Sequence, residues 1–319
     1  MGSNRSYLST CLLRVLTCNI RFPNHAPNIS SHKSLDKPPH EPSNEPSNTP
    51  SNETRLSKEP INEPSPFEEI SNEPGVDSIP PGALHFIAGG KAGIIFTIDE
   101  KRVLKEFHSP EDGNGEVERE AYQRLGSHPN ITKLLCIRAD GSIVLERGTA
   151  LRTLCQSATE IALVTKIDWL IDAAKGYQYL HECGIIHCDV GCNNLISTME
   201  GVKLIDFEGC SIDGRPGDSC YEWFSYRPAT PYTSRATDIF AFGCTIYEIV
   251  TGRPPYHEHQ SRIDAGPYVE KLYTACEFPD TTGLPLNHVM QSCWRGRFGC
   301  MSQIVRDLEH SKSLIERSA

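Results

Sequence analysis

The apolar and polar residues of this chain follow two different periods, and the change from one to the other comes about halfway along it. Between residues 84 and 146, short runs such as IIFTI and RVLKEF alternate with polar turns, which predicts β-strands. One charged segment, 115–126, interrupts these runs with an apolar residue at every fourth position, and this spacing predicts a helix. We therefore expect the amino-terminal half to be a sheet with one helix.

Further along, the apolar residues recur at helical spacing. In segment 166–184 they fall on one side of a helix, and Gly184 ends the pattern. Segment 236–252 predicts a more apolar helix that also ends at a glycine, and 285–299 and 301–315 predict two amphipathic helices. The pattern predicts an α+β protein, with a small antiparallel β-rich lobe followed by a larger α-helical lobe.

The composition is different before residue 83. Segment 36–82 is rich in Pro, Glu, Ser and Asn and contains the repeat EPSNEPSNTPSNE. It cannot bury enough apolar surface to offset the entropy of ordering, so we expect a disordered linker. Segment 1–35 has basic residues and no acid, which is typical of a mitochondrial transit peptide, and MGSNRS also fits the myristoylation pattern of a lipid anchor. A tail without any targeting role fits equally well.

Charge and cysteine usage exclude several classes of protein. A formal charge of −10 argues against non-specific nucleic-acid binding, which needs a basic surface. The 13 cysteines form no CxxC pair and no zinc-ligand spacing, so we expect free thiols in a reducing compartment, the cytoplasm or the nucleus. Since no run of 18 apolar residues occurs, we expect no transmembrane helix.

Segment 185–197, IIHCDVGCNNLIS, places a His, an Asp and an Asn between two short apolar runs. This segment and the motifs around it resemble those of the eukaryotic protein kinase family over residues 83–317. The resemblance implies a two-lobed protein-kinase-like fold for that range. The finer pattern, with TDIFAFG, looks most like fungal kinase-like proteins.

The catalytic loop, residues 187–194, is similar to the family motif H-R-D-x-x-x-x-N. The resemblance implies that Asp189 orients the attacking hydroxyl and accepts its proton, and that Asn194 holds one Mg²⁺. It implies that Asp206 in LIDFEG binds the Mg²⁺ that bridges the ATP phosphates. It also implies that the carboxylate of Asp238, in DIFAFG, caps the backbone of the catalytic loop.

The Gly-rich turn, residues 88–93 (AGGKAG), sits where the family has G-x-G-x-x-G. Gly90 and Gly93 match the last two glycines, whose missing Cβ lets backbone N–H groups approach phosphates. Lys105 resembles the strand lysine that holds the α- and β-phosphates. The resemblance places Ile95, on the strand between them, at the nucleotide.

Two further parts of the ATP site follow from the resemblance. Glu118 is the best candidate for the carboxylate that fixes Lys105, and Glu116 and Glu120 compete for that role. Leu145 would lie behind the adenine. Glu146 and Gly148 would bound the hinge that hydrogen-bonds the base.

Four residues depart from the family pattern. Cys188 replaces the Arg that grips a phosphorylated activation segment (residues 207–228), which predicts that phosphorylation of this segment is not the on-switch. Gly191 replaces the Lys that neutralises the transferring phosphate in serine/threonine kinases. Glu208 replaces the Gly of D-F-G, and 227–230 (RPAT) lacks the Glu of A-P-E.

These residues predict an enzyme with the cofactors ATP and Mg²⁺ that phosphorylates serine and threonine hydroxyls of a protein substrate, with weak or atypical activity. The departures leave a second interpretation open, a pseudokinase that binds nucleotide or partners without catalysis. A third is a small-molecule kinase of the choline or aminoglycoside type, since those enzymes also have a non-Arg residue in the H-x-D motif.

Overall fold

The computed structural model describes residues 75–110, 113, 115–218, 221–229 and 231–318. The predictions for the basic tail, and for the linker as far as residue 74, lie outside the described residues.

Residues 75–77, which the sequence assigns to the linker, contact the amino-terminal lobe. Nη1 of Arg102 donates to the carbonyl oxygens of Gly75 and Val76 at 3.0 and 2.8 Å. Nη1 of Arg138 donates to the carbonyl of Asp77 at 2.8 Å. The domain limits 83–317 stay a prediction.

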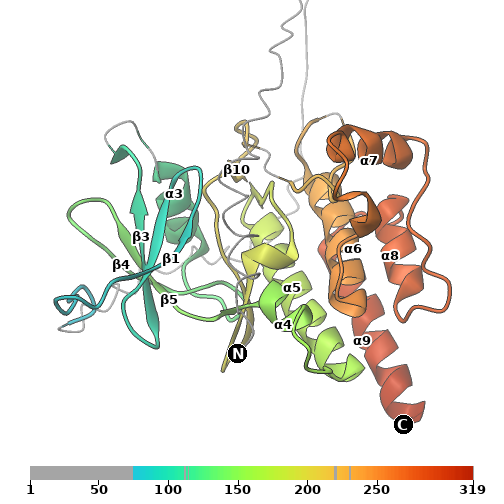
Figure 1. Cartoon of the computed structure of the whole chain (residues 1–319), viewed down its shortest axis with the longest axis horizontal. Helices are drawn as coiled ribbons and strands as arrows, with labels where there is room; N and C mark the ends of the chain where they lie inside the picture. The colour runs from blue at the N-terminus through green and yellow to red at the C-terminus, as the bar shows by residue number, and fades with distance from the viewer. Residues whose placement is uncertain (1–74, 111–112, 114, 219–220, 230, 319) are drawn as a thin grey trace, which may run out of the picture. The chain divides into compact units, whose positions relative to one another are not determined.

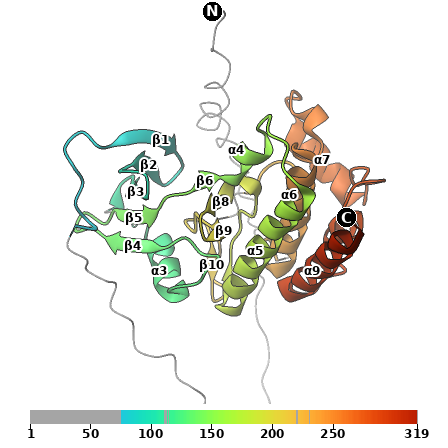
Figure 2. The same cartoon turned by 90° about the horizontal axis from the view of Figure 1, so that it is seen from below.

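The amino-terminal lobe is a five-stranded antiparallel sheet with one helix beside it (Figures 1 and 2). Its strands, in the order β1-β2-β3-β5-β4, and its helix are β1 (His85–Gly89), β2 (Gly93–Thr97), β3 (Arg102–Phe107), β5 (Ile143–Glu146), β4 (Leu134–Ile137) and α3 (Glu116–Leu125). Two acidic residues in the first turn of α3 complement the helix dipole. Gly126, at φ 55°, ends the helix.

The larger lobe is helical (Figure 1). Its helices are α4 (Leu151–Cys155), α5 (Leu163–Glu182), α6 (Arg235–Thr251), η3 (His257–His259), α7 (Ala265–Thr274), α8 (Asn287–Trp294) and α9 (Met301–Ser318). Ser234 and Thr237 form a capping box at the start of α6, and Gly252 ends it in a left-handed conformation. The sequence pattern did not predict α7, because Gly266 and Pro267 in its first turn resemble a loop, although Pro is tolerated there.

Short strands join the two lobes and carry the predicted loop. The strands and the 3₁₀ turn are β6 (Thr149–Ala150), β7 (Ile185–Ile186), η2 (Cys192–Asn194), β8 (Leu195–Thr198), β9 (Gly201–Leu204) and β10 (Ser211–Ile212). β8 pairs with β6 and β9, and β7 pairs with β10. The α+β, two-lobed architecture predicted from the sequence is therefore confirmed. None of the helices in the described part of the chain combines the length and the apolarity that a membrane span requires.

Candidate active site

Lys105 and Glu118 form an ion pair between the sheet and α3. Nζ of Lys105 lies 2.6 Å from Oε2 of Glu118, and both side chains are buried. Of the two competing acids, Glu116 is exposed and Glu120 binds Arg215 of the activation segment at 2.5 Å. The structure thus places Glu118, and not its neighbours, against the strand lysine.

Two more carboxylates share the ammonium of Lys105. Oδ1 of Asp206 lies 2.7 Å from Nζ, and Oε2 of Glu208 lies 3.1 Å from it. Burial opposes the charge of Lys105, but these three acids raise its pKa well above the usual value. Burial raises the pKa of Glu118 to about 7, with Asp206 and Glu208 adding to the rise and Lys105 opposing it. Burial also raises the pKa of Glu208.

Asp189 and Asn194 are held together within the catalytic loop. Nδ2 of Asn194 donates to both the carbonyl oxygen and Oδ2 of Asp189, each at 2.8 Å. The backbone N–H of Ile205 donates to the carbonyl of Asn194 at 3.1 Å, which joins the start of β8 to the residue before Asp206. The four predicted catalytic residues are thereby linked in two pairs, Lys105 with Asp206 and Asp189 with Asn194.

Asp238, in the first turn of α6, holds the catalytic loop through hydrogen bonds. Oδ2 accepts hydrogen bonds from His187 N at 2.9 Å and from His181 Nε2 at 2.8 Å. Oδ1 accepts from Cys188 N at 3.2 Å and from the Tyr221 hydroxyl at 2.5 Å. Burial opposes ionisation of Asp238, but its hydrogen bonds lower its pKa below the usual value. This anchor holds Cys188 at a φ of 66°, which is strained for a non-glycine residue.

A row of aromatic rings connects α3 to the catalytic loop. The rings of Tyr122 and Phe207 lie 5.0 Å apart, and Phe207 lies 5.5 Å from His187. His187 in turn lies 5.5 Å from Tyr177 of α5. Because Phe207 is fully buried between these rings, it fixes the neighbouring Asp206 toward Lys105.

The Gly-rich turn closes the hairpin of β1 and β2. The N–H of Gly90 donates to the carbonyl of Gly93 at 2.8 Å. A Cβ on Gly93 would lie 2.2 Å from the carbonyl oxygen of Glu106, so only glycine fits there. Half-buried Ile95 pairs in register with Lys105.

The predicted hinge lies between β5 and β6. Leu145 is buried in the core that also includes residues of α3. The carboxylate of Glu146 is 2.8 Å from Nζ of Lys203, so its backbone, and not its side chain, is what the hinge could offer to a base. Gly148 passes close to β8, since a Cβ there would lie 2.8 Å from the carbonyl of Ser197.

The activation segment packs over Cys188, at the position where the family has an Arg. A Cβ on Gly217 would lie 2.7 Å from Sγ of Cys188, so this segment packs directly on the thiol. Burial raises the pKa of Cys188 to about 12, which makes it a neutral packing residue.

A cluster that sequence reasoning missed holds the end of the activation segment. Arg152 of α4 contacts Glu222 at 2.5 Å and Glu248 of α6 at 2.6 Å. Glu222 also approaches the catalytic loop, because a Cβ on Gly191 would lie 3.3 Å from its Oε2. One Arg thus joins the activation segment to α6 through two carboxylates. Thr230 of the RPAT motif lies outside the described residues.

The donor atoms fit a hard divalent cation. One carboxylate oxygen from each of Glu118, Asp206 and Glu208 lies within 4.8 Å of the others. Mg²⁺ prefers oxygen ligands of this type. Asp206 and Asn194 are the residues that would hold it, as the resemblance implies.

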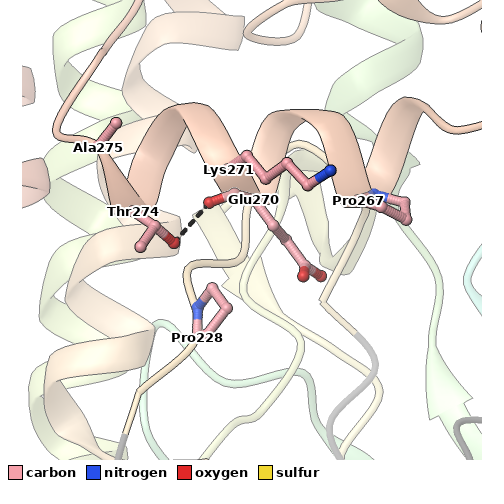
Figure 3. A pocket seen from close by; sticks show the side chains of 6 residues that line it. All are labelled: Pro228, Pro267, Glu270, Lys271, Thr274 and Ala275. Carbon is pink, nitrogen blue, oxygen red and sulfur yellow. Dashed lines mark hydrogen bonds between the residues drawn. The ribbon is translucent and has the colours of Figure 1, made fainter.

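A surface hollow of about 420 Å³ lies elsewhere in the larger lobe, between α7 and Pro228 (Figure 3). Its lining includes Pro267, Glu270, Lys271 and Thr274. None of the predicted site residues lines this hollow.

Comparison with known proteins gives consistent matches. A family model described as protein tyrosine and serine/threonine kinase matches residues 101–300. Serine/threonine-protein kinase STY17 of Arabidopsis thaliana is 26% identical over 230 residues, which cover 66% of this chain and 40% of that protein. Mitogen-activated protein kinase kinase kinase 17 of the same plant is 36% identical over 121 residues, or 36% of this chain and 32% of that protein.

Cell division control protein 7 of Schizosaccharomyces pombe is 31% identical over 150 residues, which cover 41% of this chain and 13% of that protein. The chain therefore spans less than half the length of each of these three relatives. The finer likeness to fungal kinase-like proteins stays a prediction.

Proposed function

This chain belongs to the protein tyrosine and serine/threonine kinase family, and on that premise we propose that it transfers the γ-phosphate of ATP to serine or threonine hydroxyls of a protein. The observation that carries the proposal is the assembled cluster around Lys105. Its ammonium contacts Glu118 at 2.6 Å and Asp206 at 2.7 Å. In protein kinases this lysine–glutamate ion pair, and a metal ion held by the aspartate, must both be in place for phosphoryl transfer.

In this proposal each site residue has a distinct role in the reaction. Lys105, fixed by Glu118, positions the α- and β-phosphates, and the Gly-rich turn covers them. Asp189 orients the acceptor hydroxyl and takes its proton, and Asn194 keeps the Asp189 carboxylate in place through its 2.8 Å hydrogen bond. Bound Mg²⁺ would neutralise charge on the phosphates, and Asp206 and Asn194 would hold it.

We propose that the activity is slow. Gly191 offers no cation to the transferring phosphate, and the nearby acid Glu222 adds the opposite charge. Loss of one group that stabilises charge in a transition state typically costs about 10²-fold in rate. Transfer therefore depends on the remaining groups, Lys105 above all.

We also propose that the activation segment reaches its working position without phosphorylation. Two ion pairs already join it to α3: Arg215 with Glu120 at 2.5 Å and Arg124 with Asp213 at 2.6 Å. Exposed ion pairs contribute little to stability because solvent screens them, but the packing of Gly217 on Cys188 also holds the segment in place.

A second function, a pseudokinase, is favoured by one observation. The carboxylate of Glu208 contacts the ammonium of Lys105, which is the group that a phosphate would bind. Transfer of labelled phosphate from ATP by the full chain, and its loss in the Lys105→Met variant, distinguishes the two functions. The pseudokinase predicts no transfer in either form.

We propose the cytoplasm or the nucleus as the location, because all ten cysteines in the described part of the chain are free thiols. Targeting by residues 1–35 remains the alternative that the sequence raised.

A further inference from the structure

Glu208 follows the buried Phe207 at a position where the family has glycine. Its Oε2 lies 3.1 Å from Nζ of Lys105, and its side chain is 19% exposed. Among the described residues, Lys105 is the one cation that forms an ion pair with this carboxylate. The side chain therefore contacts Lys105 and is partly open to solvent.

The charges around Lys105 are unbalanced. Three carboxylates surround one ammonium at the place where ATP would bring several more negative charges. Glu118 and Asp206 are the partners that the family pattern accounts for, and Glu208 is the additional one. It therefore takes up part of the attraction that Lys105 would otherwise offer to a phosphate.

A second lysine near the phosphate site also interacts with acids of the chain. Lys91, in the Gly-rich turn, attracts the Glu208 carboxylate and forms an ion pair with Asp218 of the activation segment. Both lysines on the phosphate side of the site are thus engaged by acids of the chain itself.

We propose that Glu208 occupies the position of a nucleotide phosphate on Lys105 and competes with ATP for it, so that this residue sets the affinity for nucleoside triphosphates. The inference rests on the proposed ATP site. It goes beyond that site because it assigns to Glu208 a role opposed to nucleotide binding. Adenosine lacks phosphates, so Glu208 should not compete with its binding.

Calorimetric titration of the full chain with ATP and with adenosine, in EDTA, tests the proposal. The variants are Glu208→Gln, which removes the charge but keeps the shape, and Glu208→Gly, which removes the side chain. Glu106→Gln is the matched control, because Glu106 is an exposed acid next to Lys105 on the same strand. A thermal melt of each variant checks that it is folded.

We expect ATP to bind about tenfold more tightly to both Glu208 variants than to the wild type, as removal of one adjacent like charge predicts. Adenosine affinity should not change, and Glu106→Gln should match the wild type. Equal ATP affinity in wild type and variants would overturn the inference while leaving the proposed function intact. Weaker ATP binding by the variants when Mg²⁺ is added would overturn it in favour of a metal-binding role. Failure of every form to bind ATP or adenosine, both in EDTA and with Mg²⁺ added, would overturn both proposals.

Discussion

Nζ of Lys105 lies 2.6 Å from Oε2 of Glu118, in a contact that joins β3 to the first turn of α3. Since both side chains are buried, removal of the Lys105 charge would leave the Glu118 carboxylate without its partner. The contact positions the lysine, so its loss should reduce catalysis more than it reduces adenosine binding.

We expect Glu118→Gln to lower kcat/KM by about 10²-fold, because Lys105 would then be misplaced at the phosphates. Glu116→Gln is the control, since Glu116 is exposed on the same helix turn. Steady-state kinetics of both variants, with a thermal melt of each, make the measurement. An equal loss in both variants would contradict the account.

Replacement of Cys188 by Arg should not restore the family arrangement. The thiol is fully buried, and Gly217 packs against it too closely for even a Cβ to fit there. Overpacking of a filled site costs about 1–3 kcal/mol, so the melting temperature should fall by several degrees. Cys276→Arg is the control, because Cys276 is exposed. A Cys188→Arg variant that is as stable as the wild type would show that the activation segment does not pack as described.

Phosphatase treatment should leave the activity of the full chain unchanged. Cys188 cannot grip a phosphate, and the two ion pairs to α3 form without one. Kinetics and mass spectrometry of treated and untreated protein make the comparison. A large loss that accompanies the removal of a phosphate from the segment 207–228 would contradict this prediction.

Tyr221 should act as a structural residue in that segment and not as a phosphorylation site. Its side chain is half-buried, and its hydroxyl donates to the buried Asp238 at 2.5 Å. Tyr221→Phe should therefore lower the free energy of unfolding by about 1–3 kcal/mol, because the buried Oδ1 of Asp238 loses one of its two hydrogen-bond donors. Denaturant unfolding measures this, with Tyr232→Phe as the exposed control.

Acid should destabilise the protein through Asp238. Its pKa is lowered in the fold below the usual 3.8: burial opposes the shift, but the hydrogen bonds from His181 and Tyr221 outweigh it. The stabilisation is therefore complete above about pH 4 and is lost as pH falls through the lowered value. Urea unfolding between pH 6 and pH 2.5 should show the fall, with a shallower slope in Asp238→Asn than in Asp168→Asn, whose carboxylate is half exposed. Equal slopes would contradict the assignment.

Local motifs explain why much of the site could be predicted from the sequence. Asp189 and Asn194 stand five residues apart in one loop, and the structure joins them by direct hydrogen bonds. Lys105 lies in a strand whose alternation is visible in the sequence, and the strands around it form the predicted sheet. Glu118 was harder to choose, because three acids share the same helix turn and only burial separates them.

The parts that could not be predicted depend on distant residues or on ambiguous local signals. Arg152 meets Glu222 across 70 positions, and no spacing rule connects α4 to the activation segment. Glu208 could be recognised as a departure, but its contact with Lys105 depends on how the chain turns after Phe207. Helix α7 was missed because Gly266 and Pro267 resemble a loop, although Val269 and Tyr273, four positions apart, are both buried.

The central claim is phosphoryl transfer by the Lys105 and Asp189 clusters. We would incubate the full chain with labelled ATP and Mg²⁺, with casein and myelin basic protein as acceptors, and compare it with Lys105→Met and Asp189→Asn. The account predicts slow transfer by the wild type and a loss of about 10²–10⁴-fold in Asp189→Asn, as expected for a missing general base. Lys105→Met should lose transfer as well. Absence of transfer by the wild type, or transfer that survives in both variants, would contradict it.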